Sequence, residues 1–155
     1  MNCNGTCSEC DYNFKKERLY RGKRLDNGEW FYGNEVWSPW LGDTSFVTLS
    51  DHENIANVDP ETVCEFTGSI TGNGTKIFEG DIIDIPGWVV TYSDGMNCCY
   101  GLQVGWYIQR DNWESYMELQ ETDRFVVIGN IYDNPEMMKN KSAVYQYCKY
   151  IEEKT

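Results

Sequence analysis

Three cysteines near the N-terminus, Cys3, Cys7 and Cys10, have a residue type and spacing that can bind a metal. Their spacing, C-x3-C-x2-C, can hold an iron–sulfur cluster or begin a zinc site. Tetrahedral zinc needs four ligands, and this segment supplies only three. The sequence favours a loose tail with free thiols, and a zinc site is the alternative.

A complete zinc site would need a fourth ligand from elsewhere in the chain or from a second chain. The candidates within the chain are His52, Cys64, Cys98 and Cys99. A radical S-adenosylmethionine cluster also has this cysteine spacing, but an aromatic residue usually precedes its last cysteine, where Glu9 stands here. Such enzymes also need a longer β/α chain, so we set that interpretation aside.

Other catalytic patterns are weak. His52 is the single histidine and lies in a polar segment, where a solvated side chain is more usual than a general base. The acidic pairs Asp81 with Asp84 and Glu118 with Glu121 have a spacing that arises by chance in so acidic a chain. The sequence contains no phosphate-binding G-x-x-x-x-G-K-[ST] loop. We therefore name no catalytic residue.

The charge of the chain is strongly negative and uneven. The net charge is −12, and residues 43–123 contain fifteen acidic residues against two basic ones. A nucleic-acid backbone needs a basic surface, so we expect no direct nucleic-acid binding. The acidic segment is either a solubilising surface or a face that meets a basic partner by imitating phosphate.

Targeting signals and cysteine use suggest a compartment. The chain has no apolar run long enough to cross a membrane, and its polar N-terminus does not resemble a signal peptide. We expect a cytoplasmic protein without membrane contact. Its seven cysteines are an odd number, so we do not expect a disulfide framework.

The elements that must position these residues are mostly strands. Asn27-Gly28 predicts a two-residue hairpin turn, and residues 35–55 predict one strand, 46–49, within a long ordered loop. Asp59-Pro60-Glu61 predicts a turn or a single helical turn. Glu79-Gly80-Asp81 predicts a bend into a strand, in which the Asp side chain bonds nearby amides.

The C-terminal third continues this pattern. Residues 125–132 predict a strand that Gly129 interrupts with a bulge or bend, and Asn134-Pro135-Glu136 predicts a helix start. Apolar residues at helical spacing over 142–154 predict a short C-terminal helix. We therefore predict a mainly β, barrel-like or sandwich-like domain over residues 14–155, preceded by a flexible tail over residues 1–13.

Three stretches, read in order, carry a family resemblance. They are LYRGKRLDNGEWFYGN (19–34), VDPETVCEFTGSITGNGTKIFEGDII (58–83) and VIGNIYDNPEMM (127–138). Together they resemble the YopX family of phage and prophage proteins. The cysteine tail is not part of that pattern. The resemblance implies a mostly β fold with a barrel-like core, and no established biochemical activity.

The tryptophans raise the question of a binding surface. The six are Trp30, Trp37, Trp40, Trp88, Trp106 and Trp113, more than a core of this size readily hides. Some lie at an interface, or they pin long loops to the domain. We expect a non-enzymatic interaction or self-assembly module with a protein partner or a homo-oligomer. The alternatives are an acidic nucleic-acid mimic that inhibits a basic host protein and a small metal-dependent or hydrolytic enzyme.

Overall fold

A computed structural model describes residues 18–38, 45–84, 86–94, 104–110, 116–120 and 122–138. Within these ranges the protein is mainly β, and its antiparallel sheets do not close into a barrel. The sandwich-like alternative of the predicted fold class is therefore the one observed. The predicted tail and the predicted C-terminal helix lie outside the described residues.

The first sheet has four strands in the order β2-β1-β6-β7. Its strands are β1 (Tyr20–Lys23), β2 (Trp30–Gly33), β6 (Cys64–Ile70) and β7 (Lys76–Phe78). The predicted hairpin between β1 and β2 is confirmed, but its turn is longer than two residues. Arg24 still donates a backbone hydrogen bond to Glu29, so the turn spans residues 25–28, with Gly28 at a φ of 72°.

A second, three-stranded sheet lies beside the first, in the order β3-β4-β5. Its strands are β3 (Glu35–Trp37), β4 (Val47–Ser50) and β5 (Ile55–Val58). The strand predicted at 46–49 is confirmed as β4, but the prediction of a loop around it was wrong, because β3 and β5 pair with β4 on its two sides. The residues of β5 alternate between exposed and buried, but the residue types do not show this pattern, because the apolar Ile55 lies on the exposed side.

The second sheet packs its inner face against β1 and β2. Leu49, Ala56 and Val58 are buried there and contact Tyr20 and Phe31. Close backbone approach holds the two sheets together: a side chain at Gly33 would put its Cβ 2.6 Å from the Ser50 carbonyl oxygen. Beyond β5, a 3₁₀ helix (η1, Pro60–Thr62) begins at Asp59, whose carboxylate accepts the Glu61 N–H at 3.0 Å. The predicted helical turn is therefore confirmed.

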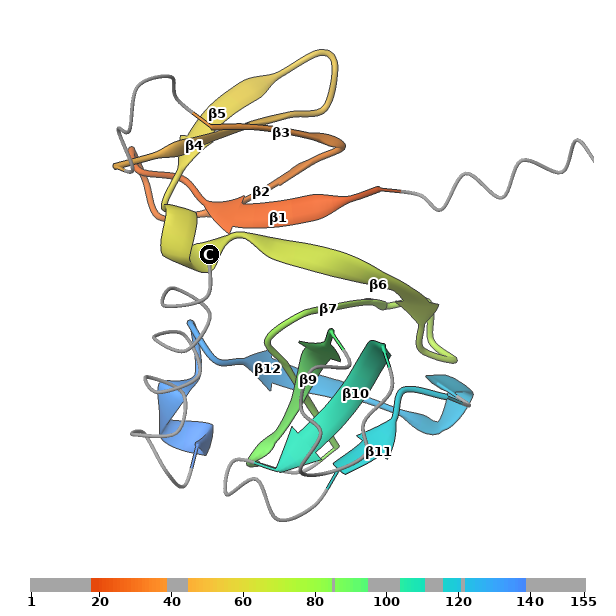
Figure 1. Ribbon diagram of the computed structural model, residues 1–155. Helices are drawn as coiled ribbons and strands as arrows, with labels where there is room; N and C mark the ends of the chain where they lie inside the picture. Colours follow the sequence, from red (N-terminus) through yellow and green to blue (C-terminus); the bar gives the residue numbers. More distant parts are fainter. Residues whose placement is uncertain are drawn as a thin grey trace, which may run out of the picture.

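The third sheet has five strands in the order β11-β10-β9-β8-β12. They are β8 (Asp81–Ile83), β9 (Trp88–Ser93), β10 (Gly105–Arg110), β11 (Tyr116–Glu118) and β12 (Val127–Asn130). Ile83, Val90 and Ile108 form its buried core together with Ile77 of β7. Figure 1 shows β1–β5 above β6 and this sheet below it, so β6 and β7 connect the two halves.

Two short elements complete the described residues. A 3₁₀ helix η2 (Thr122–Arg124) precedes β12, and a 3₁₀ helix η3 (Pro135–Met137) follows it. The pairing of β12 with β8 shifts between Val127 and Gly129, so of the predicted bulge or bend the bulge is observed, in a strand shorter than the predicted 125–132. Asn134 stands at the predicted helix start, but its side-chain oxygen accepts the N–H of Asn130 at 3.2 Å and does not cap the helix.

Candidate functional site

The cysteines that opened the sequence question, Cys3, Cys7 and Cys10, lie outside the described residues, as do Cys98 and Cys99. The structure describes two of the candidate fourth ligands, Cys64 and His52, and they lie in different environments. Cys64 is buried in the core beside Phe66 and Phe78, and burial raises the pKa of its thiol to about 12. His52 is exposed in the β4–β5 loop, with Nδ1 3.7 Å from Glu35.

The described residues contain no group of three or more His, Cys, Asp or Glu side chains that could hold a metal. The zinc site therefore stays a prediction about the N-terminal segment.

The acidic pair Asp81 and Asp84 does not form a two-carboxylate site. Asp81 is buried, whereas Asp84 is exposed at a positive φ of 59°. Asp84 accepts the N–H of Val126 at 2.8 Å and donates its own N–H to the Val126 carbonyl at 2.9 Å. It thereby fixes the approach of β12. Glu118 is exposed on β11, and Glu121 lies outside the described residues.

A buried ion pair joins the two halves of the molecule. The Arg21 guanidinium of β1 donates to Asp81 of β8 at 2.5 Å, and the side chains are 8% and 1% exposed. The second Asp81 oxygen accepts the Phe78 N–H at 2.8 Å, as the sequence predicted for this bend. Burial raises the pKa of Asp81, and the guanidinium opposes that rise. Burial lowers the pKa of Arg21, but its neighbours, Asp81 foremost, together outweigh burial and the net shift is upward.

Aromatic rings enclose the same guanidinium. Its central carbon lies 4.7 Å from the centre of the Trp30 ring and 4.6 Å from that of Phe78. A cation between two ring faces is stabilised by their negative quadrupoles, more so when it is shielded from water. This arrangement and the ion pair fix Arg21 in one position between β2 and the β7–β8 bend.

A second cluster extends this contact to the end of β12. Asp133 accepts hydrogen bonds from Lys23, from Trp30 Nε1 at 2.7 Å and from Asn130 Nδ2 at 2.9 Å. Burial would raise the pKa of Asp133, but these three donors outweigh burial and lower it to about 2. Asp133 is therefore ionised at neutral pH and joins β1, β2 and β12.

Together the two clusters form what we call the junction, defined by Arg21, Trp30, Phe78, Asp81 and Asp133. Each of the three stretches that carry the family resemblance contributes to it. Its carboxylates are matched by cations, so its geometry is that of a structural contact between distant segments.

A carboxylate pair lies beside the junction, with Glu65 on β6 and Glu79 directly after β7. Glu65 and Glu79 are opposite each other, since the Glu79 N–H donates to the Glu65 carbonyl at 3.0 Å. Burial and the neighbouring Glu65 charge raise the pKa of Glu79 to about 7. Like charges directly opposite in a ladder are destabilising, so this pair makes the β6–β7 contact sensitive to pH.

The outer face of the second sheet is a different kind of surface. Strand register puts Trp37 opposite Thr48 and Thr48 opposite Asn57, and Leu25 donates its N–H to the Asn57 carbonyl. Ile55 lies in the next row, opposite Ser50, with Glu35 beyond it. We define the outer face as Leu25, Glu35, Trp37, Thr48, Ile55 and Asn57.

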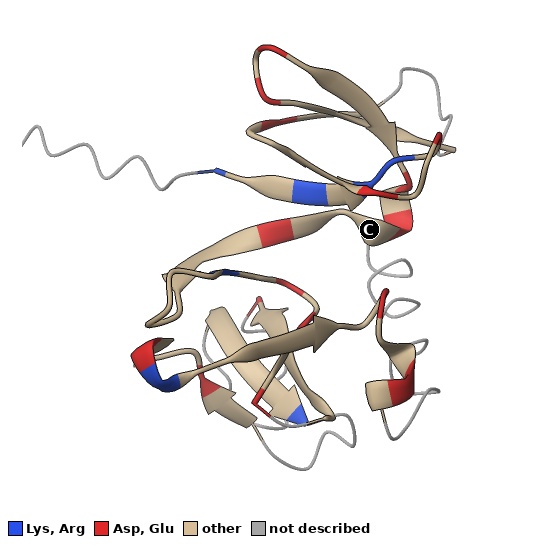
Figure 2. Cartoon of the chain, turned by 180° about the vertical axis from the view of Figure 1, so that it is seen from behind, with Lys and Arg blue, Asp and Glu red and all other residues tan. Residues whose placement is uncertain are grey.

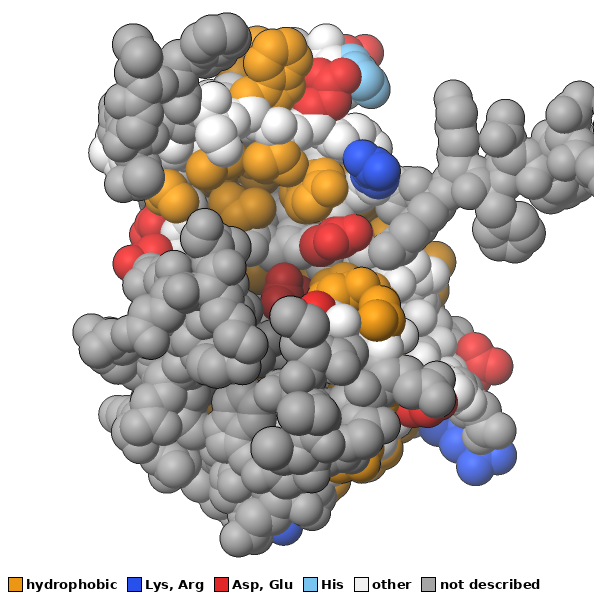
Figure 3. Space-filling view, in the orientation of Figure 1, with side chains coloured by type: hydrophobic (Ala, Val, Ile, Leu, Met, Phe, Trp, Pro, Cys, Tyr) orange, Lys and Arg blue, Asp and Glu red, His pale blue; other side chains and the backbone are white. Residues whose placement is uncertain are grey.

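Three large apolar side chains of the outer face are accessible to solvent. Trp37 is 61% exposed, Ile55 71% and Leu25 55%. Figure 3 shows hydrophobic side chains at the top of the molecule beside acidic ones and His52. Trp30, Trp88 and Trp106 are half-buried, while Trp40 and Trp113 lie outside the described residues. The tryptophans were predicted either to lie at an interface or to pin loops to the domain, and the exposure of Trp37 fits the first hypothesis.

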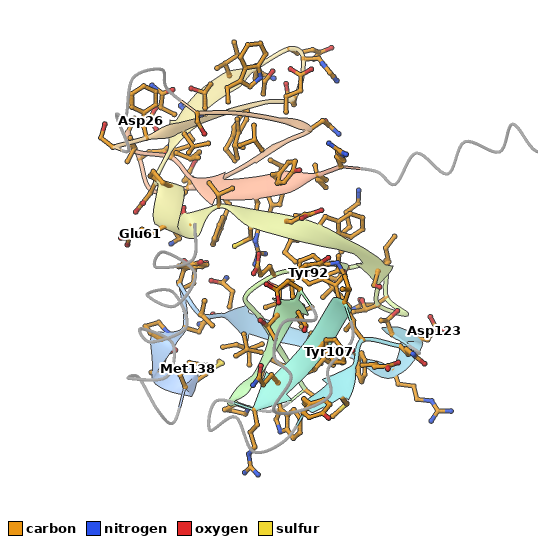
Figure 4. The ribbon with its side chains drawn as sticks, viewed as in Figure 1. Asp26, Glu61, Tyr92, Tyr107, Asp123 and Met138 are labelled. Atoms are coloured by element: carbon orange, nitrogen blue, oxygen red, sulfur yellow. The ribbon has the colours of Figure 1, made fainter. Side chains whose placement is uncertain are left out.

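The segment that forms most of the outer face is acidic in sequence. Residues 25–58 contain six acidic residues and no Lys or Arg. Figure 2 shows acidic residues in the turns at both ends of this sheet, and Figure 4 labels Asp26 at one end. Arg24, which directly precedes Leu25, is bound to Asp26 at 2.5 Å.

A hollow in the lower half is too small to be a separate ligand site. It has a volume of about 170 Å³ and is lined by Ile83, Asp84, Trp88, Ile108, Met117 and Phe125. Ligand pockets in proteins usually measure about 300–1,000 Å³ and hold several convergent polar groups. The Asp84 carboxylate, the polar group of this lining, is already bonded to Val126.

Comparison with known proteins supports the family resemblance of the sequence. The family described as YopX protein matches the chain over residues 19–139. The match covers more than half of the chain and includes the junction and the outer face. A comparison with curated proteins finds no match.

Proposed function

Because the chain belongs to the YopX family, we propose that it is a non-enzymatic accessory protein of phage or prophage origin that binds another protein. The phage origin is what the family resemblance implies. The protein-binding role is supported by the outer face, where three large apolar side chains are exposed on a sheet whose opposite face is buried. Trp is enriched among the residues that dominate binding energy.

The outer face has the rigidity that a binding surface needs. Its strands are held from behind by the buried side chains of Leu49 and Val58, which are 0% exposed. Thr48 and Asn57 are joined across the face by a side-chain hydrogen bond of 3.0 Å. Ordering of this surface would therefore cost little binding free energy when a partner binds.

The junction supports the structural side of the proposal. Its charged groups act on one another, and its hydrogen bonds connect segments far apart in the chain. Such a network is suited to holding β1 and β2 in place, and the second sheet packs its inner face against these two strands. We therefore assign the junction a structural role and the outer face the functional one.

Affinity capture from the organism that carries the gene tests this function. The test variant is Trp37→Ser combined with Ile55→Ser, and the matched control is Val104→Ser combined with Val126→Ser, since those two side chains are also exposed. We expect the wild-type protein and the control to capture the same protein. The test variant should retain at most about a tenth of it, because truncating an anchor residue usually costs 2 kcal/mol or more.

Two outcomes would contradict the proposal. Equal capture by all three proteins would remove the outer face from the function. A concentration-dependent mass in sedimentation, lost in the test variant, would replace the foreign partner with a second copy of this chain. Circular dichroism of each variant establishes that the fold is intact.

A further inference from the structure

We propose that the segment that docks on the outer face is a basic stretch of another protein that also carries apolar side chains. This inference rests on the proposed function and names the chemistry of the partner. It depends on three observations: the sign of the charge around the face, the spacing of its apolar residues, and the ion pair that Arg24 forms with Asp26.

Acidic side chains lie along the edge of the face near Ile55. Glu35 lies in the same row as Ile55, and its side chain is 43% exposed. Asp51 and Glu53 lie in the β4–β5 loop next to Ile55. Hydrogen bonds from Asn54 hold the pKa of Asp51 below its ordinary value, so this carboxylate is ionised at neutral pH.

Arg24, the cation that adjoins Leu25 in the chain, does not offset these charges. Arg24 precedes Leu25, and its guanidinium donates to both oxygens of Asp26, at 2.8 and 2.5 Å. That pair is neutral as a unit. The carboxylates of Glu35, Asp51 and Glu53 therefore set the sign of the potential that an approaching molecule meets, with His52 beside Glu35 at 3.7 Å.

This sign decides among the classes of occupant. Nucleic acid carries a dense negative charge, and the cytoplasmic surface of a membrane is anionic, so both would be repelled. A second copy of the chain would bring the same −12 net charge to the contact. A basic protein segment is attracted, and complementary charge of this kind raises the association rate and selects the partner.

The spacing of the apolar residues requires more than charge from the occupant. Leu25 and Trp37 stand at opposite ends of one row across the sheet, separated by Asn57 and Thr48. Three strand spacings amount to about 14 Å, close to the length of four residues in an extended chain. A segment with apolar side chains about four residues apart could contact Leu25 and Trp37 at the two ends of the row. Basic side chains between them could pair with the acidic residues beside it.

Three short peptides of equal length test this chemistry directly. One consists of Leu and Lys, one of Leu and Glu, and one of Ser and Lys. Titration followed by NMR shifts of the full-length protein reports both the affinity and the residues contacted. We expect the Leu–Lys peptide to shift residues 25–58 and to bind at least about tenfold more tightly than the other two.

Variants separate the contributions of charge and apolar contact. Glu35→Gln combined with Glu53→Gln should weaken Leu–Lys binding about tenfold near 0.1 M salt and much less near 0.5 M, because salt screens exposed charges. Trp37→Ser should weaken it at both salt concentrations. Glu118→Gln, which removes an exposed carboxylate on β11, is the matched control and should change little.

The results also distinguish this inference from the proposed function. Equal binding of the Leu–Glu peptide, or shifts confined to residues outside 25–58, would overturn the inference. Face-dependent capture of a protein whose contact segment, located by cross-linking, is acidic or neutral would overturn the inference and leave the function standing. Absence of any face-dependent capture would remove the function as well.

Discussion

The junction and the outer face use charge in opposite ways. In the junction, Arg21 and Asp81 are buried and paired, and Asp133 has three donors. On the outer face, acidic residues surround exposed apolar side chains, and residues 25–58 contain no Lys or Arg. Charges that are satisfied within the protein hold segments together, whereas charges left without an internal counterpart are available to another molecule.

The two regions also differ in their relation to the family resemblance. The residues of the junction come from the three stretches at 19–34, 58–83 and 127–138. Most of the outer face, including Trp37 and Ile55, comes from the segment between the first two stretches. The motifs that identify the family thus contribute the junction, and the outer face that we propose as a binding surface lies mainly outside them.

The largest expected effect is in the junction. Asp81→Asn leaves the Arg21 charge buried without its counter-ion, and we expect it to lower the free energy of unfolding by about 3–5 kcal/mol. Urea unfolding of the variant and the wild type measures this loss. Asp84→Asn is the control, because Asp84 is exposed and an amide oxygen can still accept the Val126 N–H. A loss below about 1 kcal/mol at Asp81 would contradict the structural role of the pair.

Glu79→Gln should have a smaller effect that depends on pH. The pKa of Glu79 is about 7 in the folded protein against an ordinary value of 4.5, so folding favours the protonated form. The stability that it contributes is complete below pH 4.5 and is lost as pH rises through 7. We expect the Gln variant to be more stable than the wild type at pH 8, by about 2 kcal/mol, and nearly equal at pH 4.5.

Thermal or urea unfolding over this pH range checks the Glu79 prediction. Glu65→Gln provides a second test, because it removes the charge next to Glu79. The free energy of unfolding of this variant should fall less between pH 5 and pH 8 than that of the wild type. A stability difference that does not change with pH would contradict the titration of Glu79.

Asp133→Asn should cost about 1 kcal/mol at pH 7, with the opposite pH dependence. The pKa of Asp133 is lowered to about 2, so its contribution is present above its ordinary value of 3.8 and is lost as pH falls toward 2. Solvent screening keeps the loss small, because this side chain is 37% exposed. Unfolding at pH 7 and pH 3 measures it, and an equal loss at both values would show that charge is not the cause.

The smallest effect on stability belongs to the outer face. Trp37→Ser and Ile55→Ser remove exposed side chains, so each should change the free energy of unfolding by no more than about 0.5 kcal/mol. The same variants should remove partner binding. Unfolding curves beside the capture assay check both halves. A large loss in the free energy of unfolding would show that these side chains stabilise the fold, as the junction does, and would contradict the assignment of different roles to the two regions.

Local signals allowed much of the fold to be predicted. The hairpin at Asn27-Gly28, the turn at Pro60, the bend at Gly80 and the bulge at Gly129 all depend on residues with particular backbone preferences. These preferences act over a few residues, so they are readable without tertiary context. The strand β3 was missed because its three residues pair only through β4 and have no pattern of their own.

The sites were harder to predict for the same reason. The partners Arg21 and Asp81 are 60 residues apart, and no local pattern relates them. Asp81 was expected to bond a nearby amide, which it does, but its second role depends on how β1 lies across the bend. For the outer face the readable signals were Trp37 and the absence of Lys and Arg over residues 25–58, although only the register shows which side chains share a face.

The separation of Lys23 and Asp133 in the chain has a consequence for synthesis. These two side chains are hydrogen-bonded across 110 residues, and Trp30 also bonds to Asp133. The β1–β2 hairpin can form soon after it leaves the ribosome, but Asp133 is synthesised 110 residues after Lys23. Closure of this contact must therefore wait until residue 133 has left the ribosome, and a nascent chain stalled before that point would expose an incomplete hairpin surface to chaperones and proteases.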